Sequence, residues 1–187
     1  MRAFIAVDFP ASFAESIEDV ESNFDFPGIK LVRPELVHIT MKFLGEVDES
    51  GVSRICTALS QVSFSPFEAE LLGVGVFPKP DRIKVIWLGV KGNFDALQRE
   101  VDKVLSGFGF ASSNDFTAHA TIARVKRIDS KKERQLKEKV SSLADITLGS
   151  FTVDSLRVKK STLTAKGPIY ETVCEILLNC TTSLCRK

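Results

Sequence analysis

The stretch VHITMKFLG, residues 37–45, alternates polar and apolar side chains. This period of two is typical of a β-strand with one buried face, and it places His38 on the polar face. A second stretch, FTAHATIARV, residues 116–125, carries His119, the only other histidine of the chain. In both stretches a threonine follows two positions after the histidine. The sequence therefore contains the same short pattern twice, in two predicted strands.

The two patterns belong to a longer internal repeat, because His119 lies 81 positions after His38 and a shift of 81 aligns other features. Apolar runs of strand length, and amphipathic stretches with helical spacing, recur in the same order. Each half reads as strand, helix, histidine strand, helix, strand. The paired elements are strands 2–7 and 83–88, helices 10–21 and 93–107, helices 49–62 and 130–144, and strands 69–77 and 151–160.

This repeat predicts an α+β fold of two pseudo-symmetric β-α-β-α-β lobes, whose mainly antiparallel sheets face a central cleft. Each half is too small to bury both faces of its sheet alone, so the halves should pack as lobes of one domain. The repeats run roughly over 2–78 and 83–160, followed by a final strand at 169–178. We expect a single bilobal domain over 1–179 and a C-terminal tail over 180–187.

Composition restricts the function. The 25 basic and 24 acidic residues give a net charge of +1, so a duplex-coating role is disfavoured and anion binding must come from a local patch. The four cysteines lack the spacing of a zinc site, and Cys56 is expected as a small buried apolar residue. Cys180 and Cys185 are expected to lie in the tail without chemistry. No secretory or membrane-spanning segment is recognisable, which predicts a cytoplasmic protein that does not bind membranes.

The repeated histidines and threonines suit phosphate chemistry. One imidazole can accept a proton while the other, as imidazolium, donates one near neutral pH, and hydroxyls can bind the phosphate oxygens. Since Thr40 and Thr121 share a strand face with the histidines, the four side chains are expected to converge. No acidic cluster, phosphate-binding glycine loop or G-x-S-x-G turn is present, so we expect no metal and no cofactor.

The paired motifs HITM and HATI, with MKFLG after the first, ARVK after the second and STLTAKGPIYE at residues 161–171, resemble the two-histidine phosphoesterases. Within that superfamily the chain resembles the RNA 2′,3′-cyclic phosphodiesterases, also called 2′-5′ RNA ligases. The resemblance covers nearly the whole chain, except the tail NCTTSLCRK. One departure is that Ala118 and Ala120 flank the second histidine, where bulkier residues are usual.

The resemblance implies a bilobal fold and hydrolysis of an RNA 2′,3′-cyclic phosphate to a 2′-phosphomonoester, with reversible 2′-5′ ligation in some relatives. By position, His38 would be the proton donor to the 3′ oxygen and His119 the proton acceptor that activates water. Thr40 and Thr121 would bind the phosphate oxygens. The expected partner is RNA or an oligonucleotide ending in a 2′,3′-cyclic phosphate, tRNA fragments and nucleotides included, bound by a monomer.

Further residues are candidates for substrate binding. Lys42 shares the strand face of His38 and could anchor a phosphate, or be a solvated strand-end lysine. Arg124 has the opposite parity to His119 and reaches the phosphate only if its strand bulges or ends near residue 123. Phe77 and Tyr170 could stack a base, whereas Trp87 is expected in the core.

Two other functions remain open on sequence alone. The same four side chains could hold a phosphate in a non-catalytic nucleotide-binding or RNA-binding module, although a pure binder would not need imidazoles. A metal site shared between molecules could use both histidines, but the carboxylates or cysteines that would complete its ligand shell are missing. Turnover of a nucleoside 2′,3′-cyclic phosphate separates the enzyme from the binding module.

Overall fold

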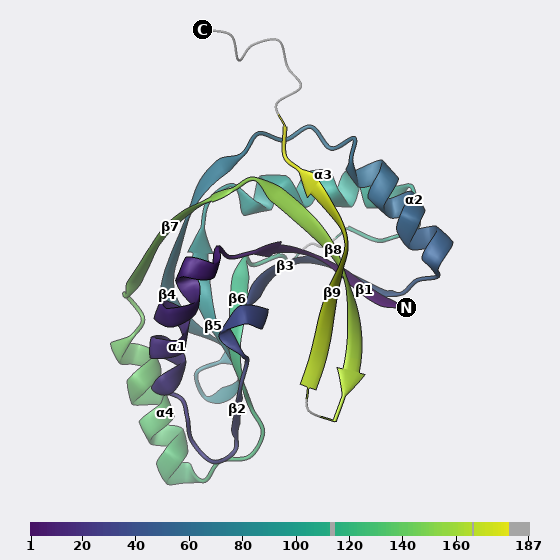
Figure 1. Cartoon of the computed structure of the whole chain (residues 1–187). Coiled ribbons are helices and arrows are strands. Elements are labelled where there is room, and N and C mark those ends of the chain that lie inside the picture. Colours follow the sequence, from purple (N-terminus) through teal and green to yellow (C-terminus); the bar gives the residue numbers. More distant parts are fainter. Residues whose placement is uncertain (113–114, 166, 180–187) are drawn as a thin grey trace, which may run out of the picture.

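The structure, a computed structural model, describes residues 1–112, 115–165 and 167–179. In this part of the chain the strands form one sheet, in which neighbouring strands pair antiparallel (Figure 1). The order across it is β7-β4-β5-β6-β3-β1-β8-β9, with β2 beside β6. The strands are β1 Arg2–Asp8, β2 Ile29–Leu31, β3 His38–Glu46, β4 Phe67–Lys79, β5 Arg82–Lys91, β6 His119–Val125, β7 Thr147–Val153, β8 Ser155–Thr164 and β9 Gly167–Leu177. The helices are α1 Ala14–Ser22, α2 Glu49–Leu59, α3 Phe94–Ser106 and α4 Ser130–Ser142, with 3-10 turns η1 Ala11–Phe13 and η2 Pro34–Leu36.

The expected α+β architecture is confirmed, and so is the repetition of its elements. Helices α2 and α4 show the repeat most directly, since aspartates 81 positions apart cap both. Asp48 accepts a hydrogen bond from the Gly51 N–H at 2.5 Å, and Asp129 accepts one from the Lys132 N–H at 2.9 Å. A side-chain oxygen at this position satisfies a backbone donor that the first helical turn leaves without a partner.

The lobes are not the two sequence halves, which corrects the expected arrangement. The first lobe comprises β9, β8, β1 and β3, and the second comprises β7, β4, β5, β6 and β2. Each lobe therefore takes strands from both halves. The expected strand 151–160 is in fact two strands that separate at Asp154: β7 pairs with β4 in the second lobe, and β8 pairs with β1 in the first.

A short connection explains this exchange. Only Pro80 and Asp81 separate β4 from β5, and a two-residue turn joins antiparallel neighbours into a hairpin. The last strand of the first half is thereby held beside the first strand of the second half. The equivalent strand β8 occupies the matching position beside β1.

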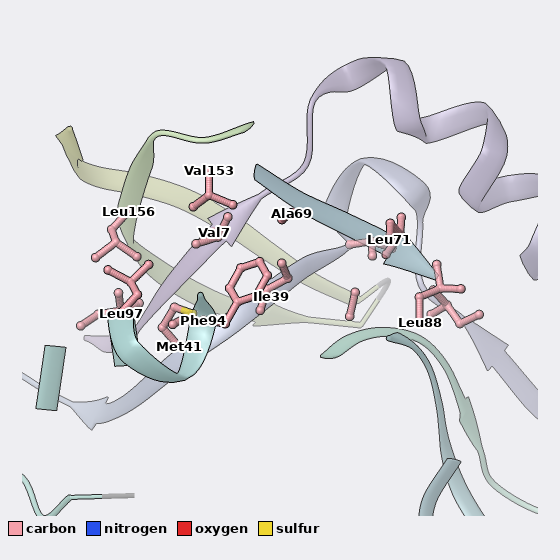
Figure 2. Packing of buried hydrophobic residues seen from close by; sticks show 14 of the residues in the cluster. Val7, Ile39, Met41, Ala69, Leu71, Leu88, Phe94, Leu97, Val153 and Leu156 are labelled. Carbon is pink, nitrogen blue, oxygen red and sulfur yellow. The ribbon is translucent and has the colours of Figure 1, made fainter. Parts of the chain in front are cut away.

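The helices pack in pairs on the buried face of the sheet (Figure 1). Helices α2 and α3 contact each other near β3 and β9, while α1 lies against β6 and α4 against β4. Figure 2 shows Phe94 and Leu97 of α3 next to Ile39 and Met41 of β3, all of them buried. The buried apolar residues form one cluster through both lobes. Since the apolar face of β3 is covered by this core, its polar residues are left on the other face of the sheet.

Candidate active site

The two lobes meet where β3 and β6 pair at Ile39 and Ala120. These residues are 81 positions apart, so the pair joins equivalent points of the repeat and the local two-fold axis passes through it. Both are fully buried, which turns the residues on either side of them to the opposite face of the sheet. We call that opposite side the histidine face, because His38 and His119 lie on it.

The antiparallel register brings the four motif side chains together on the histidine face. Extended by one residue each way from the Ile39–Ala120 pair, it sets His38 opposite Thr121 and Thr40 opposite His119. All four are half-buried. Each imidazole is thus next to a hydroxyl from the other lobe, an arrangement that can surround one tetrahedral anion with donors from two sides.

Both imidazoles are held by the same kind of hydrogen bond. Nδ1 of His38 lies 2.7 Å from the carbonyl oxygen of Leu36, and Nδ1 of His119 lies 2.7 Å from that of Thr117. Because a carbonyl oxygen only accepts, Nδ1 carries the hydrogen in each neutral ring, and Nε2 is left to exchange protons. The two rings therefore present equivalent atoms to a shared ligand.

The environment of His38 favours its neutral form. Burial lowers the pKa of His38 from 6.5, the charges of Lys159 and His119 act in the same direction, and the Leu36 carbonyl and Asp8 oppose them. A phosphate anion bound beside the ring would stabilise the imidazolium that a proton donor requires.

A charged network that sequence analysis did not place beside His38 lies along the first lobe. Asp8 pairs with His38 in the β1–β3 register, and its carboxylate is 2.6 Å from Nζ of Lys159 and 3.0 Å from Nη1 of Arg157. Arg157 also reaches Glu175 at 2.6 Å. The alternation of β1 predicts the face on which Asp8 lies. Its partners Arg157 and Lys159 are on β8, too distant in the sequence for the pattern to indicate them.

Aromatic rings surround both histidines. The ring centroid of His38 is 4.9 Å from that of Phe4 and 5.3 Å from that of Tyr170. The centroid of His119 is 4.9 Å from that of Phe77 and 6.1 Å from that of Trp87. Phe77 and Tyr170, the candidates for base stacking, therefore lie beside the histidines.

Trp87 is not a core residue, in contrast to the expectation. Its half-buried ring lies on the histidine face beside Phe77 and His119, with a centroid 5.1 Å from that of Phe77. Gly75, its partner on β4, makes room for it: a Cβ on Gly75 would be 2.2 Å from two indole carbons. The residues around Trp87 are apolar, which suggested that the whole strand is buried. An antiparallel strand needs only one buried face, so its other face can carry Trp87.

Matching β-bulges decide the positions of Lys42 and Arg124. In β3 the register with β1 shifts across Met41, and in β6 the register with β5 shifts across Ile122, 81 positions later. A bulge adds one residue to a strand, so each side chain after it lies on the opposite face of the sheet from the one that the alternation predicts. The bulge that the hypothesis about Arg124 required is therefore present, and Phe43 is the equivalent residue of β3.

Lys42 does not lie with the histidines, which corrects the expectation for a phosphate anchor. The bulge turns it toward α3, where its Nζ is 2.8 Å from a carboxylate oxygen of Asp102 and donates to the carbonyl oxygen of Ala111 at 2.5 Å. The Asp102 carboxylate also accepts a hydrogen bond from Gln98 at 2.7 Å. Lys42 is a buried structural cation that holds α3 and the loop after it to the sheet.

The positive charges of two arginines act on Tyr170. Burial raises the pKa of the Tyr170 hydroxyl, and the charges of Arg124 and Arg2 act against that rise. The phenol is therefore neutral near pH 7 and can donate a hydrogen bond to an anion. Arg2 and Arg124 come from different lobes, so both lobes contribute positive charge that acts on Tyr170.

Cys56 is not a free buried thiol, as had been expected, but forms a disulfide with Cys174. The bond joins α2 to β9 across a sequence separation of 118, with a Cα–Cα distance of 6.4 Å. Disulfides are uncommon in the cytosol of mesophiles, so the cytoplasmic location stays a prediction. Cys180, Cys185 and the expected tail lie outside the described residues.

Among the described residues, no group of three or more His, Cys, Asp or Glu side chains is arranged to hold a metal ion. No helix in the same part of the chain is long and apolar enough to cross a bilayer. A surface hollow of about 440 Å³ lies against α4. Another, of about 360 Å³, lies at the start of α3 and is lined by Thr117 and Ala118, the two residues before His119.

The family described as LigT-like phosphoesterase has a model that matches residues 7–87 and 89–170. This chain belongs to the LigT-like phosphoesterase family. The two matched stretches divide the chain near the β4–β5 hairpin, as the internal repeat does, and each contains one of the paired histidines. The resemblance to two-histidine phosphoesterases is thereby confirmed.

Relatives and solved structures resemble the LigT-like chain over nearly its whole length. RNA 2′,3′-cyclic phosphodiesterases of Methanocaldococcus jannaschii and Archaeoglobus fulgidus are each 40% identical to it, covering 94% and 91% of this chain and 99% and 97% of their own. A Thermus thermophilus crystal structure has a TM-score of 0.82 at 24% identity and covers 97% of this chain and 100% of its own. Escherichia coli LigT complexed with 3′-AMP has a TM-score of 0.75 at 21% identity, covering 95% and 97%. These structural likenesses confirm the fold.

Proposed function

We propose that this LigT-like phosphoesterase hydrolyses RNA 2′,3′-cyclic phosphodiesters to RNA 2′-phosphomonoesters without a metal. The observation that carries the proposal is the convergence of two equivalently held imidazoles and two hydroxyls around the Ile39–Ala120 pair. Curated relatives that are 40% identical are named RNA 2′,3′-cyclic phosphodiesterases, which supports the same activity here.

In the proposed reaction, Nε2 of His119 accepts a proton from water as the water oxygen bonds to phosphorus. The bond from phosphorus to the 3′ oxygen breaks, and Nε2 of His38 donates its proton to that oxygen. Hydroxyls of Thr40 and Thr121 donate hydrogen bonds to the non-bridging oxygens, where charge accumulates. The product is a 2′-phosphate with a free 3′ hydroxyl. The same path accounts for 2′-5′ ligation when the 5′ hydroxyl of another RNA attacks in place of water, and the reverse of that step cleaves the 2′-5′ bond.

The two sides of the site differ, and this difference would orient the substrate. On the second lobe, Trp87 and Phe77 offer aromatic faces for the terminal base. On the first lobe, Tyr170 can donate a hydrogen bond to the phosphate, with the guanidinium of Arg124 reaching from across the site. The bound ribose is therefore held in one orientation, with its 3′ oxygen toward His38. We propose that the enzyme acts as a cytoplasmic monomer on RNA ends, including those of tRNA fragments.

Hydrolysis of a nucleoside 2′,3′-cyclic phosphate in excess EDTA tests the proposal. We expect full activity with chelator present and a product that is almost entirely the 2′-phosphate, because each imidazole can reach only one side of the phosphorus. Phosphorus NMR distinguishes the two product isomers. Activity that returns only after a divalent ion is added would contradict the metal-free mechanism. Tight binding without turnover would favour the non-catalytic binding module. A mixture of 2′- and 3′-phosphate products would contradict a single orientation of the bound ribose.

The pH dependence of kcat/KM should be bell-shaped, with its acid limb below pH 6.5, because burial lowers the pKa of His38 from that value. Below the lower apparent pKa of the coupled pair both imidazoles carry protons, so no acceptor remains and activity falls. Asp8→Asn removes a charge that raises the pKa of His38 and should move the acid limb to lower pH. Lys159→Gln should move it to higher pH. Shifts of the same sign in both variants would contradict this electrostatic role.

A further inference from the structure

Phe43 is an aromatic residue on the histidine face that the catalytic arrangement does not use. Its side chain is 70% exposed, and it is the one aromatic among the large apolar residues exposed in the described part of the chain. The bulge at Met41 turns it to this face instead of Lys42. Its ring centroid is 6.4 Å from that of Phe4, whose ring in turn lies 4.9 Å from His38. Phe43 is thus separated from a catalytic imidazole by a single ring.

One arginine near this edge of the site is available for phosphate. Arg2 shares the strand face of Phe4 on β1 and is exposed. Among the described residues it has no ion-pair partner, whereas Lys159 and Arg157 are paired with Asp8. An exposed aromatic ring and a guanidinium group without an ion pair are the elements of a site for single-stranded RNA.

The asymmetry of the repeat fits a substrate that extends in one direction. An RNA with a terminal 2′,3′-cyclic phosphate has no nucleotide beyond that phosphate, so the rest of the chain leaves the site only through the 5′ side of the terminal ribose. A platform for a second base is then needed on one side alone. Phe43 has no aromatic equivalent, because the residue 81 positions later is Arg124.

We infer that Phe43, together with Arg2, is a binding subsite for the base and the linking phosphate of the nucleotide that precedes the cyclic phosphate. This inference rests on the proposed function and extends it from a terminal nucleotide to an oligonucleotide. The base stacks on the exposed Phe43 ring, and the Arg2 guanidinium binds the phosphodiester that joins the last two nucleotides. The subsite makes the protein prefer dinucleotides and longer RNA to mononucleotides.

The test compares a nucleoside 2′,3′-cyclic phosphate with a dinucleotide that ends in the same cyclic nucleotide. Wild-type protein should have the higher kcat/KM on the dinucleotide. Phe43→Ala should lower kcat/KM on the dinucleotide by roughly 5- to 100-fold, the range for loss of one base–aromatic stack, and leave the mononucleotide unchanged. Phe43→Trp should keep the preference, since it retains a stacking face. Arg2→Gln should lower kcat/KM on the dinucleotide and make that kcat/KM less dependent on salt concentration.

Leu177→Ala is the matched control, because Leu177 is also exposed, at 61%, but lies at the opposite end of β9 from the hairpin turn. It should leave both substrates unchanged. An equal loss on both substrates in Phe43→Ala would show that Phe43 acts through Phe4 and His38, and would overturn the inference. So would an unchanged dinucleotide preference.

Calorimetric binding of the corresponding 2′-phosphate products separates this inference from the proposed function. If neither cyclic substrate is turned over, the proposed function fails. A dinucleotide product that still binds more tightly than the mononucleotide in wild type, with the difference lost in Phe43→Ala, would nevertheless support the base subsite. Equal binding of the two products by wild type would overturn it.

Discussion

Replacing either histidine with alanine is expected to lower kcat on a nucleoside 2′,3′-cyclic phosphate by roughly 10²- to 10⁴-fold. The two imidazoles carry out different proton transfers in one step, so each should be required. Both are half-buried at the start of a strand, and neither contributes to the hydrophobic core, so both variants should remain folded. A thermal unfolding scan alongside the steady-state assay checks the fold and the activity on the same samples.

Matched variants make this experiment sharper. His38→Asn can keep a donor for the Leu36 carbonyl but cannot transfer a proton, so it should be as inactive as His38→Ala. The double alanine variant should be little worse than either single variant, because groups that act as a unit are not additive. Turnover within tenfold of wild type in any of these variants would contradict the two-histidine mechanism.

The different roles of the histidines can be separated with a leaving group that needs no protonation. On a 4-nitrophenyl phosphodiester of a nucleoside, a variant without the proton donor should recover much of its activity relative to wild type. A variant without the acceptor should not. Recovery by His38→Ala alone would support His38 as donor, whereas recovery by His119→Ala alone would exchange the two assignments.

Loss of the Cys56–Cys174 disulfide is expected to lower the free energy of unfolding by about 2 to 5 kcal/mol. The bond closes a loop with a sequence separation of 118 and ties α2 to β9, the strand at one edge of the sheet. Cross-links across long loops restrict the unfolded chain the most in the entropic account. For a chain of this size the corresponding fall in Tm is about 5 to 20 °C.

Scanning calorimetry of wild type and of the Cys56→Ser/Cys174→Ser variant, each with and without reductant, measures this contribution. Reductant should lower the Tm of wild type to near that of the variant and leave the variant unchanged. Because Cys180 and Cys185 remain in both proteins, they serve as an internal control for other thiol effects. A wild-type Tm that reductant does not change would contradict a stabilising role for this bond.

Local patterns in the sequence determined the order of the strands and helices of this protein and the strand face that carries the histidines. The alternation around His38 and His119 identified both strands and the face that carries the motif, because side chains alternate faces along a strand whatever its neighbours are. The shift of 81 positions identified the order of the helices and strands, since an internal duplication repeats its apolar spacing. These signals lie within a few residues of each other or at one constant offset, and they were enough to predict the α+β fold and the four central side chains.

Partners that are distant in sequence were decided only by the tertiary structure. The bulges at Met41 and Ile122 exist relative to neighbouring strands, so the pattern of β3 alone wrongly placed Lys42 with His38. The exchange of strands between lobes, the pairing of Cys56 with Cys174 and the position of Trp87 over Gly75 likewise depend on which segments meet. Periodicity gives the face of a side chain within its own element, but contacts between elements follow from packing the whole chain, and those contacts made the two sides of this site different.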